Sequence, residues 1–175
     1  MSEETKTAQK LTIASMDKPN QAAFTVTAQY NPKEIQIDQN VPWKKPDAAT
    51  QEGSQKAKAA ADEDPIALEF VGAEGRSITV ELLFDNYENK DSAPIIDNVG
   101  KLAALSSVIK PGSSEEKERR PHQCMVTWGG TLPKFKCVIE SFSTKYTMFD
   151  GAGNPLRATC TVKLKEANAV EKKKK

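Results

Sequence analysis

Apolar and polar residues alternate with a period of two along most of the patterned segments of this 175-residue chain. Successive side chains of a β-strand point to opposite faces, so this alternation predicts strands with one buried face. In residues 77–85, the apolar Ile78, Val80, Leu82 and Phe84 share one face. The other runs of this kind are residues 24–30, 35–37, 66–71, 124–128, 135–139, 142–149 and 157–166. The pattern therefore predicts about eight strands.

Residues that favour turns separate these runs. Asn31-Pro32 ends the first run, because proline cannot donate a hydrogen bond to a strand ladder and restricts the residue before it. A glycine-containing segment, residues 72–75, lies between the runs at 66–71 and 77–85. The sequence therefore predicts that these two strands form a hairpin.

One segment has the spacing of a helix. Its apolar residues recur every three or four positions and are Ile95, Val99, Leu102, Leu105 and Ile109. Asp91 or Ser92 is suited to the N-cap and Pro94 to the first turn, whereas Pro111-Gly112 stops the helix. The apolar stripe predicts packing against the sheet.

Together, these elements predict a mainly β fold with one helix (α+β), in which short strands and frequent turns favour a closed or nearly closed barrel or a sandwich. We expect residues 1–20 to form a polar N-terminal arm, 21–167 one domain and 168–175 a basic C-terminal tail. Residues 44–64 contain almost no large apolar side chain. They predict a mobile loop, or an arm that becomes ordered only against a neighbouring subunit.

The composition limits the classes of partner. Hydrophobic residues make up 38% of the chain, and 25 Lys and Arg residues balance 24 Asp and Glu residues. General electrostatic capture of nucleic acid or an anionic membrane surface needs a cationic field, so neither is indicated. No apolar run approaches the ~20 residues that span a bilayer, and the N-terminus lacks the apolar core of a secretion signal. We therefore expect synthesis in the cytoplasm and no membrane insertion.

No constellation of residues predicts catalysis, a metal site or a cofactor. The three cysteines, Cys124, Cys137 and Cys160, lie in predicted strands and are expected to be buried free thiols. A zinc site would need paired cysteines or several histidines, whereas His122 is the only histidine. The strand carboxylates Glu81, Asp85 and Glu140 have no spacing that pairs them for acid–base work. The sequence does not predict an enzyme.

Several short phrases lie at the ends and corners of the predicted strands. They are Tyr30-Asn31-Pro32, Trp43, Leu83-Phe84-Asp85, Arg120-Pro121, Trp128-Gly129 and Pro155-Leu156-Arg157-Ala158. In this order, over roughly residues 20–167, the chain resembles the tube-initiator, or baseplate hub, protein of phage-tail-like contractile injection systems. None of the phrases supplies a nucleophile with a base or a phosphate loop, which is typical of a protein that works by assembly.

The resemblance implies a tail-tube-like β-barrel of about eight strands, flanked by a single α-helix, that forms a homohexameric ring. Such a ring adapts the trimeric spike hub to the inner tube and contacts other baseplate proteins. The particle is assembled in the cytoplasm and is then released or anchored to a membrane. Members of this family commonly carry a C-terminal LysM module for peptidoglycan. Residues 167–175 leave no room for one, which is expected either of a shorter family member or of a truncated sequence, so this chain gives no support for direct cell-wall binding.

Residues of the phrases are the candidates for assembly or for fold corners. They are Tyr30, Asn31, Pro32, Trp43, Phe84, Asp85, Trp128, Gly129, Phe149, Pro155 and Arg157. Aromatic residues are favoured in interface cores, although each of these also suits packing within one chain. Arg157 follows a proline turn, and we expect it to form a hydrogen-bonded corner with Asp85 or Asp150.

Three other interpretations remain open at this stage. The same alternation suits an ordinary monomeric barrel. Within the family, the chain is alternatively an inner-tube protein proper, which would stack into long tubes. In a different class, it is a barrel that binds a small ligand or a carbohydrate, which would have a defined pocket.

Overall fold

The computed structural model describes residues 9–45, 68–88, 95–115 and 118–168, which fall into two units. The larger unit comprises Met1–Asp38 and Arg76–Lys175, and the smaller unit comprises Gln39–Gly75. The smaller unit is therefore an insertion into the larger one along the chain.

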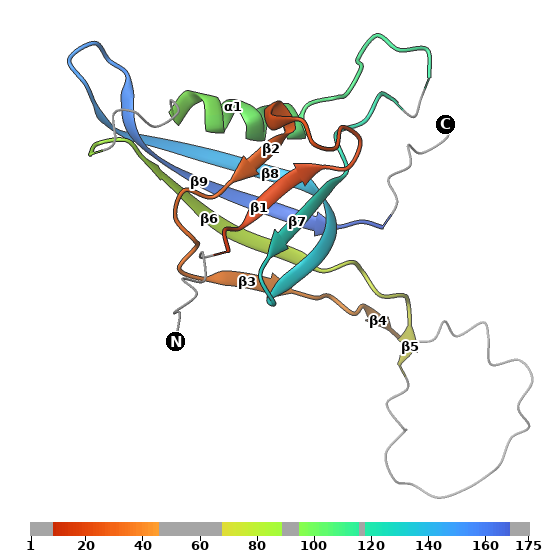
Figure 1. Ribbon diagram of the computed structural model, residues 1–175. Helices are drawn as coiled ribbons and strands as arrows, with labels where there is room; N and C mark the ends of the chain where they lie inside the picture. The colour runs from red at the N-terminus through yellow and green to blue at the C-terminus, as the bar shows by residue number, and fades with distance from the viewer. Residues whose placement is uncertain (1–8, 46–67, 89–94, 116–117, 169–175) are drawn as a thin grey trace, which may run out of the picture. The chain divides into compact units, whose positions relative to one another are not determined.

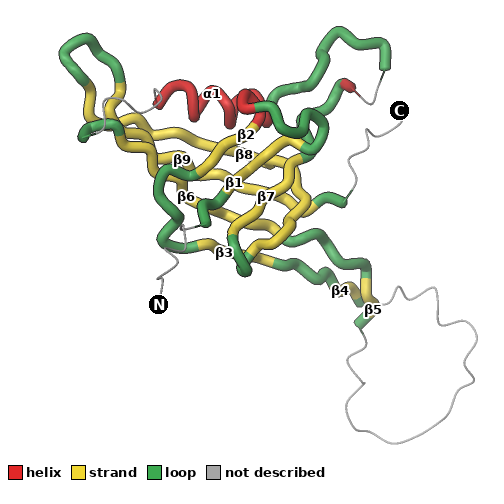
Figure 2. Tube along the Cα trace, viewed as in Figure 1, coloured by secondary structure: helices red, strands yellow, loops and turns green. Residues whose placement is uncertain are grey.

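Seven antiparallel strands form the sheet of the larger unit (Figures 1 and 2). Their order across the sheet is β2-β1-β7-β8-β9-β6-β3. The strands are β1 (Thr12–Ser15), β2 (Thr25–Thr27), β3 (Ile35–Asp38), β6 (Ser77–Asp85), β7 (Cys124–Trp128), β8 (Leu132–Phe149) and β9 (Pro155–Glu166). β8 lies at the centre of this order, so it joins the β2-β1-β7 half to the β9-β6-β3 half.

The prediction of a mainly β fold with one helix is confirmed for the described part of the chain, but the eight-stranded barrel is not. β2 and β3 form the two edges of the sheet and do not pair with each other. Instead of closing edge to edge, the two halves of the sheet contribute to one buried core, as the crossing of β1 and β7 over β6 and β9 in Figure 1 shows.

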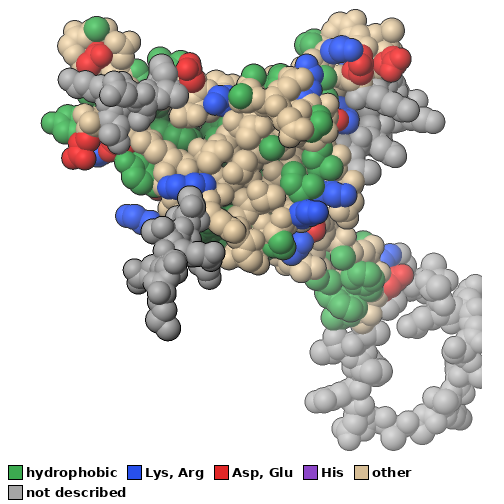
Figure 3. All heavy atoms as spheres, viewed as in Figure 1, with side chains coloured by type: hydrophobic (Ala, Val, Ile, Leu, Met, Phe, Trp, Pro, Cys, Tyr) green, Lys and Arg blue, Asp and Glu red, His purple; other side chains and the backbone are tan. Residues whose placement is uncertain are grey.

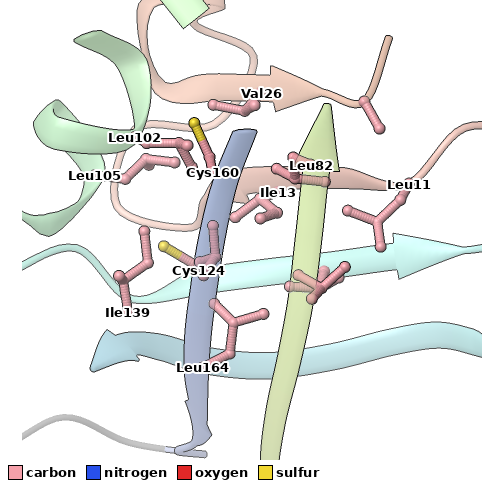
Figure 4. Packing of buried hydrophobic residues seen from close by; sticks show 14 of the residues in the cluster. Leu11, Ile13, Val26, Leu82, Leu102, Leu105, Cys124, Ile139, Cys160 and Leu164 are labelled. Carbon is pink, nitrogen blue, oxygen red and sulfur yellow. The ribbon is translucent and has the colours of Figure 1, made fainter. Parts of the chain in front are cut away.

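The core is formed by the alternating apolar residues that predicted the strands. Figure 4 shows Ile13 from β1, Val26 from β2, Leu82 from β6 and Cys160 from β9 within the same cluster of side chains. All four side chains have 2% or less of their surface exposed. Burying a large apolar side chain contributes about 1.5–3 kcal/mol, so this cluster is the main source of stability.

Helix α1 (Ile95–Ser106) covers one side of the sheet. Its buried residues, Ile95, Leu102 and Leu105, belong to the predicted stripe and to the core cluster. The predicted caps before residue 95 lie outside the described residues. The helix ends before the predicted Ile109, because the N–H of Ile109 donates to the carbonyl of Arg120 at 3.0 Å instead of continuing the helix. The short 3₁₀ helix η1 (Ala22–Phe24) also contacts α1.

The alternation of β8 changes phase at a β-bulge. Ile139 lies opposite Leu164, but Ser141 lies opposite Lys163, so Glu140 is an extra residue. From Phe135 to Ile139 the odd-numbered residues of β8 face the core, and after the bulge the even-numbered ones do. The sequence pattern predicted residues 135–139 and 142–149 as separate runs. The bulge joins them into one strand of 18 residues.

Strand β1 lies within residues 1–20, which the sequence analysis assigned to a polar arm. Leu11 and Ile13 are buried, and β1 pairs with both β2 and β7. β1 has four residues and only one large apolar side chain, Ile13, which is too weak a pattern for a prediction.

The smaller unit contains β4 (Trp43–Lys44) and β5 (Glu69–Phe70), which pair with each other. The predicted hairpin between residues 66–71 and 77–85 is therefore wrong. β6 pairs instead with β3 and, along its whole length, with β9. Nine matched positions with β9 outweigh the local turn, because each cross-strand pair adds its own contribution.

The bulge predicts that two neighbouring deletions in β8 differ in their effect on stability. Deletion of Glu140 restores regular alternation and removes only an exposed ion pair with Lys163, worth about 0–1 kcal/mol. Deletion of Ser143 turns Thr144 and Tyr146 to the wrong face of the sheet. We expect the first variant to unfold cooperatively near the wild-type temperature by circular dichroism, and the second to lose cooperative unfolding. Equal behaviour of the two variants would contradict the bulge assignment.

Candidate assembly site

A long part of β8 has a strand partner on one side only. β7 pairs with β8 from Leu132 to Cys137, whereas β9 pairs with it from Cys137 to Phe149. Over residues 141–149, therefore, no described strand pairs with the edge of β8 that faces away from β9. We call this edge the open β8 edge. An unpaired edge presents N–H and C=O groups that another strand can bind.

Hydrogen bonds at the two ends of β9 show which of its residues face β6. The N–H of Asn86 donates to the carbonyl of Leu156 at 2.9 Å. At the other end, the N–H of Glu166 donates to the carbonyl of Arg76 at 2.7 Å. Backbone groups alternate in direction along a strand, so the even-numbered residues of β9 face β6 and the odd-numbered ones face β8.

The same alternation identifies the residues at the open β8 edge. The β8 partners of the odd-numbered β9 residues are Ser141, Ser143, Lys145 and Thr147. The backbone groups of these four residues are directed to β9. Those of the intervening residues Phe142, Thr144 and Tyr146 therefore point to the open edge.

The sheet has a polar face on the side opposite the core. Its residues on β6, β8 and β9 include Thr79, Glu81, Leu83, Ser141, Ser143, Lys145, Thr147, Thr159, Thr161 and Lys163. Both signs of charge occur on this face, and Lys163 pairs with Glu140 across the bulge at 3.1 Å. A face rich in hydroxyl groups, with neighbouring charges paired, is suited to contact with water.

Asp85 and Arg157 form the corner that the sequence predicted. Arg157 Nε donates to Asp85 Oδ2 at 2.9 Å, and the two residues are direct partners across β6 and β9. The N–H of Tyr87, together with this guanidinium, lowers the pKa of the Asp85 carboxyl below its usual value. Asp150, the other candidate, instead binds the N–H groups of Ala152 and Asn154 in its own loop.

Asn31 also occupies a fold corner. Its Oδ1 accepts the N–H of Leu11 at 3.1 Å and its Nδ2 donates to the carbonyl of Gln9 at 2.9 Å. The side chain therefore holds the segment that leads into β1. Of its neighbours in the sequence phrase, Tyr30 is exposed and Pro32 is buried.

The other predicted residues do not gather at one place. Phe84 lies in the core cluster, and Trp128 is partly buried and packs against this cluster. Gly129 has a positive φ of 49° in the turn before β8, which favours glycine. Phe149 and Pro155 face each other at the end of the β8–β9 pair, and Phe149 is exposed. Trp43 lies in the smaller unit. Their roles in assembly remain predictions.

The smaller unit has an exposed apolar face. Trp43 and Phe70 are partners across β4 and β5, and their ring centroids lie 5.5 Å apart. Val41 and Leu68 lie two residues before Trp43 and Phe70 and are exposed as well, and hydrophobic side chains gather in this unit in Figure 3. We call these four residues the aromatic ribbon face. None of the described residues of this unit is buried. A two-stranded ribbon alone is marginally stable in water, so a covering partner would stabilise it.

A buried Ser–His pair lies elsewhere in the larger unit. The hydroxyl of Ser15 accepts the N–H groups of Asp17 and Lys18 at 3.1 and 3.0 Å, so its own O–H donates to Nδ1 of His122 at 2.7 Å. Asp17 Oδ2 lies 4.0 Å from the same Nδ1. In a catalytic triad the serine and the carboxylate contact different ring nitrogens, so this is not triad geometry. The pair links β1 to the segment before β7.

Burial and neighbouring charges favour the neutral form of His122. Burial lowers its pKa, Asp17 opposes this effect, and the positive charges of Lys18 and Arg120 add to it. Burial alone would raise the pKa of Asp17, but hydrogen bonds from Arg120 and from the N–H of Gln123 outweigh it and keep that pKa low. The sequence does not predict this network, because Ser15 and His122 are 107 residues apart and belong to no motif.

The three cysteines are buried free thiols, as expected. Burial raises the pKa of Cys124 to about 12 and also raises those of Cys137 and Cys160. Protonated thiols are poor nucleophiles and poor metal ligands. Within the described ranges, no group of three or more His, Cys, Asp or Glu side chains could hold a metal ion.

Cys124 and Cys137 are direct partners across β7 and β8 but are badly placed for a disulfide. The N–H of Met16 donates to the carbonyl of Gln123 at 2.8 Å, so Gln123 faces β1 and Cys124 faces β8. The two cysteines therefore form a hydrogen-bonded pair, in which Cβ atoms lie near ~5.5 Å. A disulfide needs about 3.5–4.5 Å.

These features are typical of a β-rich subunit of a larger assembly. A family model described as contractile injection system tube protein matches residues 7–175. The match covers nearly the whole sequence, and the chain belongs to this family. No curated protein matches the chain. None of the helices in the described ranges is long and apolar enough to cross a membrane.

His122 predicts a loss of stability at mildly acidic pH. Because its pKa is lowered in the folded state, the unfolded chain takes up the proton first as the pH falls below ~6.5. The free energy of unfolding should therefore fall between pH 7 and 5, by at most about 1.4 kcal/mol per pH unit from this residue.

His122→Asn is the matched control, since its amide oxygen can accept the Ser15 hydroxyl but does not titrate. It loses the ring contact with Phe24, whose centroid lies 4.8 Å away, so it should be less stable by about 1–3 kcal/mol at pH 7.5. Urea unfolding at pH 7.5, 6.5 and 5.5 should show a shallower pH dependence for the variant. Equal pH dependences would contradict the assignment.

Trp43→Ala should weaken assembly without destabilising the larger unit. Trp43 is 56% exposed, and none of the described residues of the smaller unit is buried, so the free energy of unfolding should change by less than about 0.5 kcal/mol. Size-exclusion chromatography with light scattering measures association. The double variant Lys44→Ala/Glu69→Ala removes a 3.4 Å ion pair from the same two strands and should associate normally. Loss of association in both variants alike would show that the aromatic ribbon face has no special role.

Proposed function

We propose that this chain is a structural, ring-forming tube initiator that joins the spike hub of a contractile injection particle to its inner tube and baseplate. Membership of the tube protein family supports the particle and the structural role. The order of the sequence phrases supports the initiator position. On this proposal the chain has no catalytic activity and assembles in the cytoplasm.

The open β8 edge is the observation that carries the ring. A strand of a neighbouring copy that pairs with Phe142, Thr144 and Tyr146 would extend the sheet from one subunit to the next. Strand addition of this kind obtains affinity from main-chain hydrogen bonds. Six copies joined by one repeated, heterologous contact would close into a ring.

The polar face supports an inner, water-filled channel. It lies on the same β6, β8 and β9 strands as the open edge, so extending the sheet would extend this face around the ring. Hydroxyl groups and paired charges, such as Lys163 with Glu140, would leave such a channel wet and without a strong field of either sign.

A proline at residue 144 tests the ring. The N–H of Thr144 points to the open edge, so Thr144→Pro removes a donor there without removing a hydrogen bond between β8 and β9. Thr144→Val is the control, because it keeps the N–H and loses only the hydroxyl that lies 3.4 Å from Cys160 Sγ. We expect rings by negative-stain microscopy for the wild type and the valine variant, and single subunits for the proline variant.

The outcome can overturn the proposal in two ways. Rings formed equally by Thr144→Pro would show that this edge is not the contact. A wild-type protein that stays monomeric, alone and with the spike and tube proteins, would exclude a ring subunit. Long homotypic tubes would favour the second candidate, an inner-tube protein proper, which membership of the tube protein family also suits.

A further inference from the structure

The side chain of Gln29 binds both backbone groups of a residue that is 56 positions away. Its Nε2 donates to the carbonyl of Asp85 at 2.7 Å, and its Oε1 accepts the N–H of Asp85 at 2.8 Å. A residue of a paired strand makes these same two bonds to its partner. The carboxamide therefore occupies the place of one strand residue beside the end of β6.

The place that it occupies is an otherwise uncovered strand edge. β3 pairs with β6 only from Ser77 to Val80. Because the N–H of Asn86 is directed to β9, the backbone groups of Asp85 and Leu83 point the other way, towards the side of β3. Among the described residues, no strand lies beside this part of β6 on that side. We call it the β6 end edge.

We propose that Gln29 closes the β6 end edge against the extended edge of a second copy of this chain. Left uncovered, Leu83 and Asp85 would offer two successive pairs of donors and acceptors, with the half-exposed Leu83 side chain beside them. Such an edge would compete with the open β8 edge for neighbouring copies. Its closure removes one competing edge, so that copies associate through a single repeated contact, which a closed ring requires. This inference rests on the proposed ring.

Gln29→Ala is the test variant, and Gln36→Ala is its control. Gln36 is an exposed glutamine on β3. Its side-chain amide donates to the carboxylate of Asp38 at 3.0 and 3.1 Å. Light scattering over a concentration series measures association, and negative-stain microscopy distinguishes rings from irregular polymers. We expect Gln29→Ala to form irregular polymers at a concentration at least tenfold below that of the control. Hydrogen exchange at the Asp85 N–H should be at least tenfold faster in Gln29→Ala.

A background with a blocked β8 edge separates this inference from the proposed ring. In the Thr144→Pro protein, adding Gln29→Ala should produce self-association that Gln36→Ala does not. Faster exchange at Asp85 without any change in association, in either background, would show that Gln29 has only a structural role, and the ring proposal would be unaffected. Rings in Thr144→Pro alone would overturn the ring contact. Irregular polymers in the double variant, in place of the rings of Thr144→Pro alone, would then still measure the closure by Gln29.

Discussion

The double pairing of β8 is the constraint on which the rest of the structure depends. Its first part pairs with β7 and its second part with β9, so among the described strands it alone joins the two halves of the sheet. The bulge at Glu140 changes the phase between these parts, which keeps apolar residues on the core side of both. The core cluster, with residues from both halves and from α1, exists only because this one strand serves both ladders.

Local patterns predicted much of this fold, and pairing over long distances explains most of what they missed. Period-two alternation found β3, β6, β7 and β9 at nearly their observed bounds, and helical spacing found α1. The alternation predicted two strands in place of β8, because a bulge changes the alternation in the same way as the start of a new strand. It paired residues 66–71 with β6 because a glycine turn is a local signal, whereas the nine-residue match with β9 is not. β1 was not predicted, because its four residues are too few to show a clear alternation of apolar and polar side chains.

The candidate site was predictable only in part, for a related reason. The bond between Arg157 and Asp85 could be expected from the proline turn, and Asn31 could be expected at a corner. An open strand edge, by contrast, is a property of sheet order, which the sequence does not state. The carboxamide of Gln29 and the bond between Ser15 and His122 join residues 56 and 107 positions apart, and no spacing motif announces either.

The placement of Cys124 opposite Cys137 has a consequence for the setting in which the protein can work. Two neighbouring thiols would normally make a subunit sensitive to its redox environment. Here the pair is hydrogen-bonded through its backbone, buried, and held protonated by its surroundings. A disulfide between these two residues is therefore disfavoured under oxidising as well as reducing conditions. The β7–β8 pairing at this position therefore does not depend on a covalent bond between the two thiols.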